Sequence, residues 1–246
     1  MRKITKLSPS AINTWQTCPF QYYCHYLDNR EQIKTPDSAS FGTNVHDILD
    51  HYYDLVTPET TIAEVPDLVD RAYTELGNWA LDKRKTAKRK SQQSFIRFEK
   101  KRINQKLGMP TLREKMLYAT ISPDLPKIYG KMDVYFETGG LIVDWKTGKW
   151  AELSDSLKIQ GKIYKLLLEA NGYHPKKIIF DFVVMGKRVI LPEVSTTWVI
   201  GKIEDMMEQM KNMKFIKNRE GNGLCNKWCG YRLDCDLDEM CPLVIP

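Results

Sequence analysis

The apolar positions of the chain follow a helical period in the first half and a strand period after the middle. Ser8 as N-cap and Pro9 at the first helical position predict a helix that continues through the aromatic residues up to Tyr26. Apolar residues at helical spacing predict a second helix over Phe41–Leu55. Residues 62–119 are predicted to be wholly helical.

From residue 128 onward the pattern is that of a sheet. Residues 128–136 alternate, Glu137–Gly140 has turn chemistry and residues 141–146 are largely apolar, which together predict a β-hairpin. The other predicted elements are a helix over 154–171, strands over 177–185 and 188–194, and a helix capped by Ser195 or Thr196 that runs to about Phe215. This order predicts an α/β (α+β) fold with a mixed central sheet flanked by helices.

Composition places the chain among ordinary globular proteins, with 42% hydrophobic and 28% charged residues in a length of 246. No run approaches the roughly 18 apolar residues that span a bilayer, and the basic N-terminus lacks the apolar segment of a signal peptide. We therefore expect a cytoplasmic protein that does not interact with a membrane.

The positive charge of the chain is concentrated in one segment. Residues 82–106 carry a net charge of +9, so the rest of the formal +6 chain sums to −3. Such a patch is typical of proteins that bind a polyanion. Phe95 and Phe98 lie within the patch and would either stack on bases or, as we favour, pack in the core. The cations predicted to contact DNA phosphates are Lys83, Arg84, Lys88, Arg89, Arg97 and Lys101.

Two aspartates and a lysine stand in the predicted hairpin. Asp144 and Lys146 are two residues apart, so both side chains point to one face of the strand, and the hairpin brings Asp133 beside them. Paired carboxylates are hard oxygen ligands for Mg²⁺ or Mn²⁺, and a neighbouring lysine can assist a water molecule. An exposed Asp–Lys surface pair would have the same spacing, but the apolar residues Leu141–Val143 indicate a buried strand.

Several segments resemble motifs of the PD-(D/E)xK nuclease superfamily, in particular its RecB-like exonuclease branch. Gly130–Asp133 and Val143–Gly148 resemble the two catalytic motifs of that branch. Phe41–His46 resembles its G-x-x-x-H motif, and Gln160–Tyr164 resembles its Q-x-x-x-Y motif. The similarity begins at residue 7 and leaves only residues 57–125 without a counterpart. It implies one restriction-endonuclease-like domain over 1–246, with 57–125 as a helical basic insertion.

The resemblance also implies roles for individual residues. His46, Asp133, Asp144 and the backbone carbonyl of Trp145 would hold Mg²⁺ or Mn²⁺, and Lys146 would assist the attacking water. Gln160 and Tyr164 would support the site or contact the DNA backbone.

A metal-dependent DNA exonuclease acting on single strands or DNA ends is the function that the resemblance implies. The pathway would be recombination, repair, CRISPR adaptation or phage DNA processing, with a helicase or a CRISPR or phage replication protein as partner. The chain is also similar to CRISPR-associated adaptation nucleases, to the AddB nuclease domain and to phage relatives. A structure-specific endonuclease and a catalytically silent DNA-binding or scaffold subunit remain as alternatives.

A cysteine-rich segment lies at residues 225–241. Cys225, Cys229 and Cys235 fall within eleven residues, a density that is typical of zinc or iron–sulfur ligands, with Cys241 as the nearest fourth thiol. Many RecB-like nucleases bind a [4Fe–4S] cluster through one early and three late cysteines, and Cys18 occupies the early position. The spacing here is C-x3-C-x5-C instead of the usual C-x2-C-x5-C, which leaves Cys225 and Cys241 as alternatives. Zinc and unligated thiols remain open.

Overall fold

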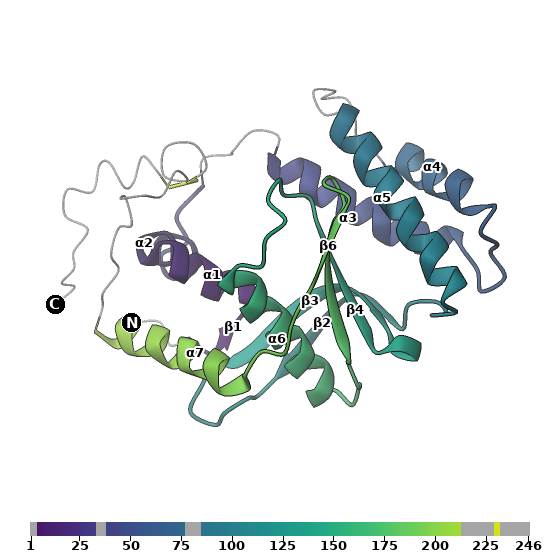
Figure 1. Ribbon diagram of the computed structural model, residues 1–246. Coiled ribbons are helices and arrows are strands. Elements are labelled where there is room, and N and C mark those ends of the chain that lie inside the picture. The colour runs from purple at the N-terminus through teal and green to yellow at the C-terminus, as the bar shows by residue number, and fades with distance from the viewer. Residues whose placement is uncertain (1–3, 33–37, 77–84, 213–228, 232–246) are drawn as a thin grey trace. The chain divides into compact units, whose positions relative to one another are not determined.

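The computed structural model describes residues 4–32, 38–76, 85–212 and 229–231 (Figure 1). The chain forms two compact units. The first comprises Met1–Pro36, Tyr118–Gly130 and Val194–Pro246, and the second comprises Asp37–Leu117 and Lys131–Glu193.

The sheet of the second unit is built around the predicted hairpin. Strand β3 (Lys127–Phe136) pairs antiparallel with β4 (Leu141–Lys146), with Val134 opposite Val143, so this prediction is confirmed. Strand β5 (Lys177–Phe182) lies parallel to β4 on its other side, and β6 (Lys187–Ile190) is an antiparallel edge strand. Mixed pairing and flanking helices confirm the predicted fold class.

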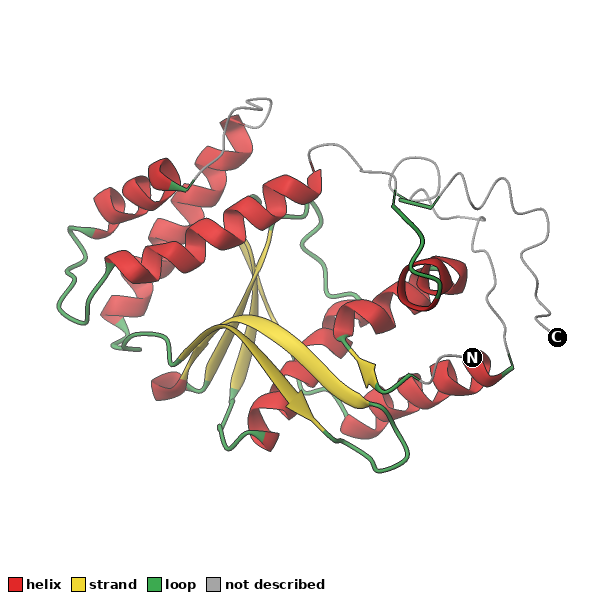
Figure 2. Cartoon of the chain, turned by 180° about the vertical axis from the view of Figure 1, so that it is seen from behind, coloured by secondary structure: helices red, strands yellow, loops and turns green. Residues whose placement is uncertain are grey.

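Helices lie on both faces of the sheet (Figure 2), and alternate residues of β4 face these two helical layers. Leu141, Val143 and Trp145 belong to a core shared with helices α3 (Ser38–Leu55), α4 (Val65–Glu75) and α5 (Lys85–Asn104). The residues between them, including Asp144, face helix α6 (Asp155–Ala170), because side chains alternate across a strand.

Two glycines allow this arrangement. Gly140 closes the hairpin with φ of 56°, and a Cβ there would lie 2.8 Å from the carbonyl oxygen of His174. Gly161 lies on the sheet-facing side of α6, where a Cβ would meet Leu191 at 2.6 Å and Phe180 at 3.3 Å. A glycine here lets α6, whose N-cap is Ser154, pack closely against β5.

The prediction that residues 62–119 are wholly helical is wrong. Helix α5 ends at Asn104, and Leu112–Ala119 form strand β2, which pairs with β3. Pro110 cannot continue a helix, and buried Leu117 and Ala119 alternate with exposed Met116 and Tyr118. The charged residues at the start of the strand concealed this alternation.

In the first unit, strand β1 (Lys6–Leu7) pairs parallel with the start of β3. The Ser8 hydroxyl accepts a hydrogen bond from the Ala11 amide and starts helix α1 (Pro9–Thr17), as predicted. The helix does not continue to Tyr26, because Cys18 is extended with φ of −162° before Pro19. The chain continues as α2 (Pro19–Tyr22) and a π-helix over Tyr23–Leu27. The unit also contains α7 (Thr196–Lys211), which is capped by Ser195, one of the two predicted caps.

Among the helices that the structure describes, none combines the length and apolar character needed to span a membrane.

Candidate active site

The site is built on the β3–β4 hairpin of the second unit. Asp133 of β3 lies beside β4, where one oxygen, Oδ2, accepts a hydrogen bond from the Trp145 amide at 2.6 Å. Asp144 lies within β4 with only 2% of its side chain exposed. The hairpin therefore brings both predicted carboxylates together, as their spacing requires.

Lys146 and Gln160 hold the buried Asp144 carboxylate between them. The Lys146 ammonium lies 2.7 Å from Asp144 Oδ2 and donates a hydrogen bond to Gln160 Oε1 at 2.9 Å. The Gln160 amide donates to Asp144 Oδ1 at 2.9 Å. The carbonyl oxygen of Gln160 thus fixes the Lys146 side chain, and its amide nitrogen fixes the Asp144 side chain.

Tyr164 anchors this arrangement from the next turn of α6. The Gln160 amide donates to the Tyr164 hydroxyl at 2.9 Å, and that hydroxyl donates to the Lys131 carbonyl at 2.9 Å. The Q-x-x-x-Y pair therefore connects α6 to both strands of the hairpin, with Tyr164 itself buried.

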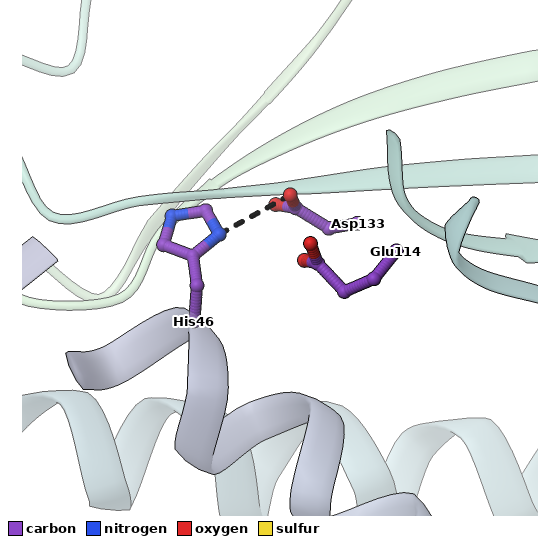
Figure 3. A group of neighbouring side chains, drawn as sticks. All are labelled: His46, Glu114 and Asp133. Carbon is purple, nitrogen blue, oxygen red and sulfur yellow. Dashed lines mark ion pairs between the residues drawn. The ribbon is translucent and has the colours of Figure 1, made fainter. Parts of the chain in front are cut away.

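His46 and Glu114 complete the site from two other elements. His46 Nδ1 lies 3.1 Å from Asp133 Oδ1. A ligand atom of Glu114 lies within 4.8 Å of those of His46 and Asp133. Figure 3 shows the three side chains pointing toward one another from α3, β2 and β3. Glu114 is not among the residues predicted from sequence, because residues 112–119 were expected to be helical.

Burial and charge shift the pKa values of the site. Burial raises the pKa of the Asp144 carboxyl to about 6, and the charge of Asp133 adds to the rise while Lys146 opposes it. Burial disfavours the charged form of His46, but its hydrogen bond to Asp133 and the nearby carboxylates outweigh burial and raise its pKa. Burial also raises the pKa of Glu114.

These residues fit a divalent cation. The carboxylates of Asp133 and Glu114 converge with the His46 imidazole. The nearby Asp144 carboxylate, which interacts electrostatically with Asp133 and His46, is buried, where a charge needs a compensating partner. Carboxylate oxygens with one imidazole form a donor set suited to Mn²⁺ or Mg²⁺. Lys146 is the one cation in contact with Asp144 among the described residues.

We expect Mn²⁺ affinity to fall as the pH is lowered through about 6, because protons compete for the Asp144 carboxylate and the His46 imidazole. Both pKa values are raised, so the loss of Mn²⁺ affinity begins at higher pH than it would for ordinary carboxylates. The affinity should fall by about tenfold per pH unit for each displaced proton. Electron paramagnetic resonance of free Mn²⁺ measures this affinity. A dissociation constant independent of pH between about 5 and 7 would contradict this assignment.

The predicted DNA-contacting cations divide into two groups. Arg89, Arg97 and Lys101 are exposed on α5 and Lys88 is half-buried, whereas Lys83 and Arg84 lie outside the described residues. Phe95 and Phe98 are buried and pack edge-on against Trp145, with ring centroids at 5.3 and 4.9 Å. Their place in the core, which the sequence analysis favoured, is confirmed.

Two of the predicted cluster cysteines lie together in the first unit. Cys18, Cys24, Phe20 and Tyr231 form a small core against which Cys229 packs. Cys24 is fully buried. Cys225, Cys235 and Cys241 lie outside the described residues.

Comparison with known proteins agrees with the geometry. The model of the PD-(D/E)XK nuclease superfamily matches residues 6–242, so the chain belongs to this superfamily, whose nucleases act on DNA with divalent metals.

Solved structures show more distant similarity. A candidate exonuclease from Eubacterium rectale is 15% identical, with a TM-score of 0.47 over 84% of this chain and 79% of that chain. The protein SSO0001 is 16% identical, with a TM-score of 0.39 over 85% of this chain and 98% of that chain. No curated protein matches the sequence.

Proposed function

We propose that this protein is a metal-dependent DNA exonuclease of the RecB-like branch. The observation that carries the proposal is the contact network of Asp144, Lys146 and Gln160 on a buried strand, next to Asp133 and His46. A buried carboxylate–ammonium pair contributes little to stability on its own, so its place at the end of β4 favours a chemical role.

His46, Asp133, Asp144 and the Trp145 carbonyl would hold Mg²⁺ or Mn²⁺. When bound, such a cation polarises the phosphodiester and lowers the pKa of a water ligand. Lys146 would orient or deprotonate the attacking water and offset charge on the phosphate. Gln160 would keep Lys146 and Asp144 in position, and Tyr164 would fix Gln160 through the Lys131 carbonyl.

The exposed cations of α5 would bind the DNA backbone. Lys88, Arg89, Arg97 and Lys101, together with Lys83 and Arg84, would neutralise phosphates and make binding dependent on salt. If the basic segment 57–125 acts as an arch, it favours a DNA end or a threaded single strand.

Digestion of end-labelled DNA with Mn²⁺ or with EDTA tests the proposal. Single-stranded, duplex and closed circular substrates of the same sequence are compared. Degradation of the linear forms with Mn²⁺ alone is the expected result. Equal cleavage of circular DNA would favour the structure-specific endonuclease, and binding without cleavage would favour the silent scaffold subunit. The neighbouring genes would distinguish a helicase, CRISPR or phage replication partner, and with it the pathway.

A [4Fe–4S] cluster on Cys18, Cys225, Cys229 and Cys235 is part of the proposal, with Cys241 as the alternative to Cys225. The grouping of Cys18 with Cys229 supports it. We expect a brown protein that absorbs at about 400 nm. The role of the cluster would be structural. Cys18→Ser should abolish this absorption, whereas Cys24→Ser, in the same small core, should retain it. A colourless protein with stoichiometric zinc would contradict the assignment.

A further inference from the structure

Glu114 has an unusual backbone for a residue within a strand. Its φ is +44°, and of the three non-glycine residues with positive φ in the described ranges, it alone lies in a regular element. The left-handed region costs an L-residue roughly 1–2 kcal/mol. Surrounding contacts must therefore hold this conformation, and such strain concentrates at functional sites.

The preceding residue, Arg113, is anchored to helix α3. Its guanidinium donates to the Asp50 carbonyl at 2.8 Å through Nη1 and to Asp54 Oδ1 at 2.7 Å through Nη2. The Asp50 carboxylate lies 3.6 Å from the same group. A planar guanidinium that binds two points at once fixes orientation as well as distance.

Both partners of Arg113 share a helix face with the site histidine. His46, Asp50 and Asp54 follow one another at intervals of four residues on α3, so they line one side of the helix. The Arg113 contacts therefore fix the position of β2 against the face of α3 that carries His46. In consequence they also fix the separation between His46 and Glu114.

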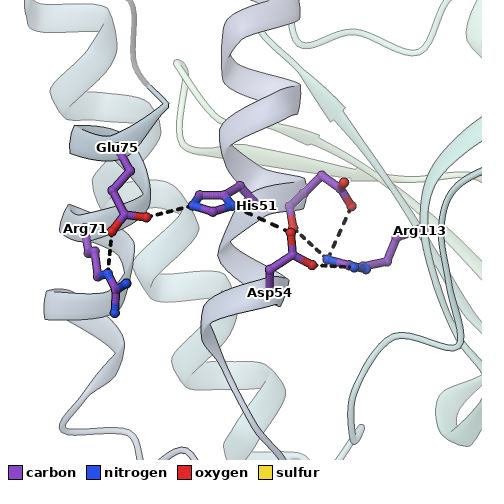
Figure 4. Close-up of polar contacts among 6 residues, drawn as sticks. His51, Asp54, Arg71, Glu75 and Arg113 are labelled. Carbon is purple, nitrogen blue, oxygen red and sulfur yellow. Dashed lines mark hydrogen bonds and ion pairs between the residues drawn. The ribbon is translucent and has the colours of Figure 1, made fainter.

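A second arginine in the same network provides a comparison (Figure 4). Asp54 also contacts His51, whose other nitrogen lies 2.9 Å from Glu75. Glu75 in turn accepts a hydrogen bond from Arg71 at 2.6 Å. Arg71 thus joins the same chain of charges from α4, but it makes no hydrogen bond or ion pair with β2 among the residues that the structure describes.

We propose that β2 contributes two residues to the metal centre: Glu114 as a further carboxylate ligand and Arg113 as the residue that positions it. The inference rests on the proposed metal-dependent function, because it assigns these residues to the same cation. Glu114 is half-buried, and its carboxylate also contacts Lys131, which partly balances the acidic charge before a cation binds. Arg113 acts through Glu114 and touches no reacting atom.

Mn²⁺ binding to the full chain without DNA tests this proposal, with free Mn²⁺ measured by electron paramagnetic resonance. Glu114→Gln should weaken Mn²⁺ binding by about tenfold or more, and Arg113→Met by about tenfold. Arg113→Lys should recover only part of the loss, because an ammonium cannot make both contacts. Arg71→Met should leave the affinity unchanged. Melting temperatures in EDTA separate this effect from unfolding.

The outcomes are distinguishable. Mn²⁺ affinities of Glu114→Gln and Arg113→Met within twofold of the native chain would overturn the proposal, even if DNA cleavage is observed. Equal weakening by Arg71→Met would overturn the positioning role of Arg113 and indicate a general effect of the helical layer. If Arg113→Met does not fold, Asp54→Ala, which removes one of its contacts, should give a smaller loss of the same kind. Absence of cleavage by a protein that binds Mn²⁺ as predicted would contradict only the nuclease proposal.

Discussion

Asp144→Asn should lower the rate of metal-dependent DNA cleavage by about a thousandfold or more, because the neutral amide removes a carboxylate ligand from the centre of the site. Lys146→Ala should give a comparable loss, since no other cation in the described chain contacts Asp144. Initial rates on end-labelled DNA at saturating Mn²⁺ measure both effects. Full activity in either purified variant would exclude the proposed mechanism.

The same substitution should not destabilise the apo protein. The pKa of Asp144 is raised to about 6, so folding holds this carboxylate charged above that pH at a cost in free energy. A carboxyl group whose pKa is higher in the folded than in the unfolded chain binds its proton more tightly when folded. The free energy of unfolding therefore decreases as the pH rises from the pKa of the unfolded chain through about 6. Asp144→Asn removes this cost, and its melting temperature at neutral pH should not fall.

Asp181→Asn is the matched control for the loss of a buried aspartate. Asp181 lies on the neighbouring strand β5 with no exposed surface, and its Oδ2 accepts a hydrogen bond from Arg188 at 2.8 Å. It shares a strand face with Ile179 and Val183, which pack in the α3–α5 core. Burial also raises the pKa of Asp181, so Asp181→Asn, like Asp144→Asn, should not lower the melting temperature at neutral pH, and it should leave the cleavage rate unchanged. Equal loss of cleavage in both variants would show that the effect of Asp144→Asn is not specific to the site.

The hairpin and α6 could be predicted from sequence because their signals are local. The alternation before Gly140, the positive φ that a glycine provides there, and the Ser154 cap all lie within a few residues of what they specify. The i, i+4 spacing of Gln160 and Tyr164 likewise fixes one helix face. Resemblance to a family then gave these positions a chemical meaning.

Glu114 could not be predicted in the same way. It lies next to Arg113, whose partners on α3 are about sixty residues earlier in the chain, so no local pattern places it near His46. The residues before Leu117 also lack clear alternation, because polar side chains of β2 face the site and α3. The break at Cys18 was missed for a simpler reason: the aromatic residues continue the apolar pattern across Pro19.

Arg102→Met should lower the free energy of unfolding by about 3–5 kcal/mol, because it leaves a buried carboxylate without its charged partner. Arg102 Nε donates to Glu99 Oε2 at 2.8 Å, and the Tyr53 hydroxyl donates to Glu99 Oε1 at 2.7 Å. Glu99 has no exposed surface. Burial raises its pKa, while Arg102 opposes the rise. Chemical denaturation of the native chain and the variant measures the loss.

The cause can be separated from lost packing by pH and by a second substitution. Without Arg102, Glu99 should take up a proton on folding, so the stability of Arg102→Met should recover, relative to the native chain, as the pH is lowered. The double substitution Glu99→Met and Arg102→Met should recover most of the lost free energy of unfolding, since neither charge of this buried pair remains. Lys101→Met changes the adjacent, exposed face of α5 and should alter stability by less than about 0.5 kcal/mol. If that face binds DNA, Lys101→Met should weaken DNA binding and reduce its salt dependence. One face of α5 would then pack in the core, and the other would bind the substrate.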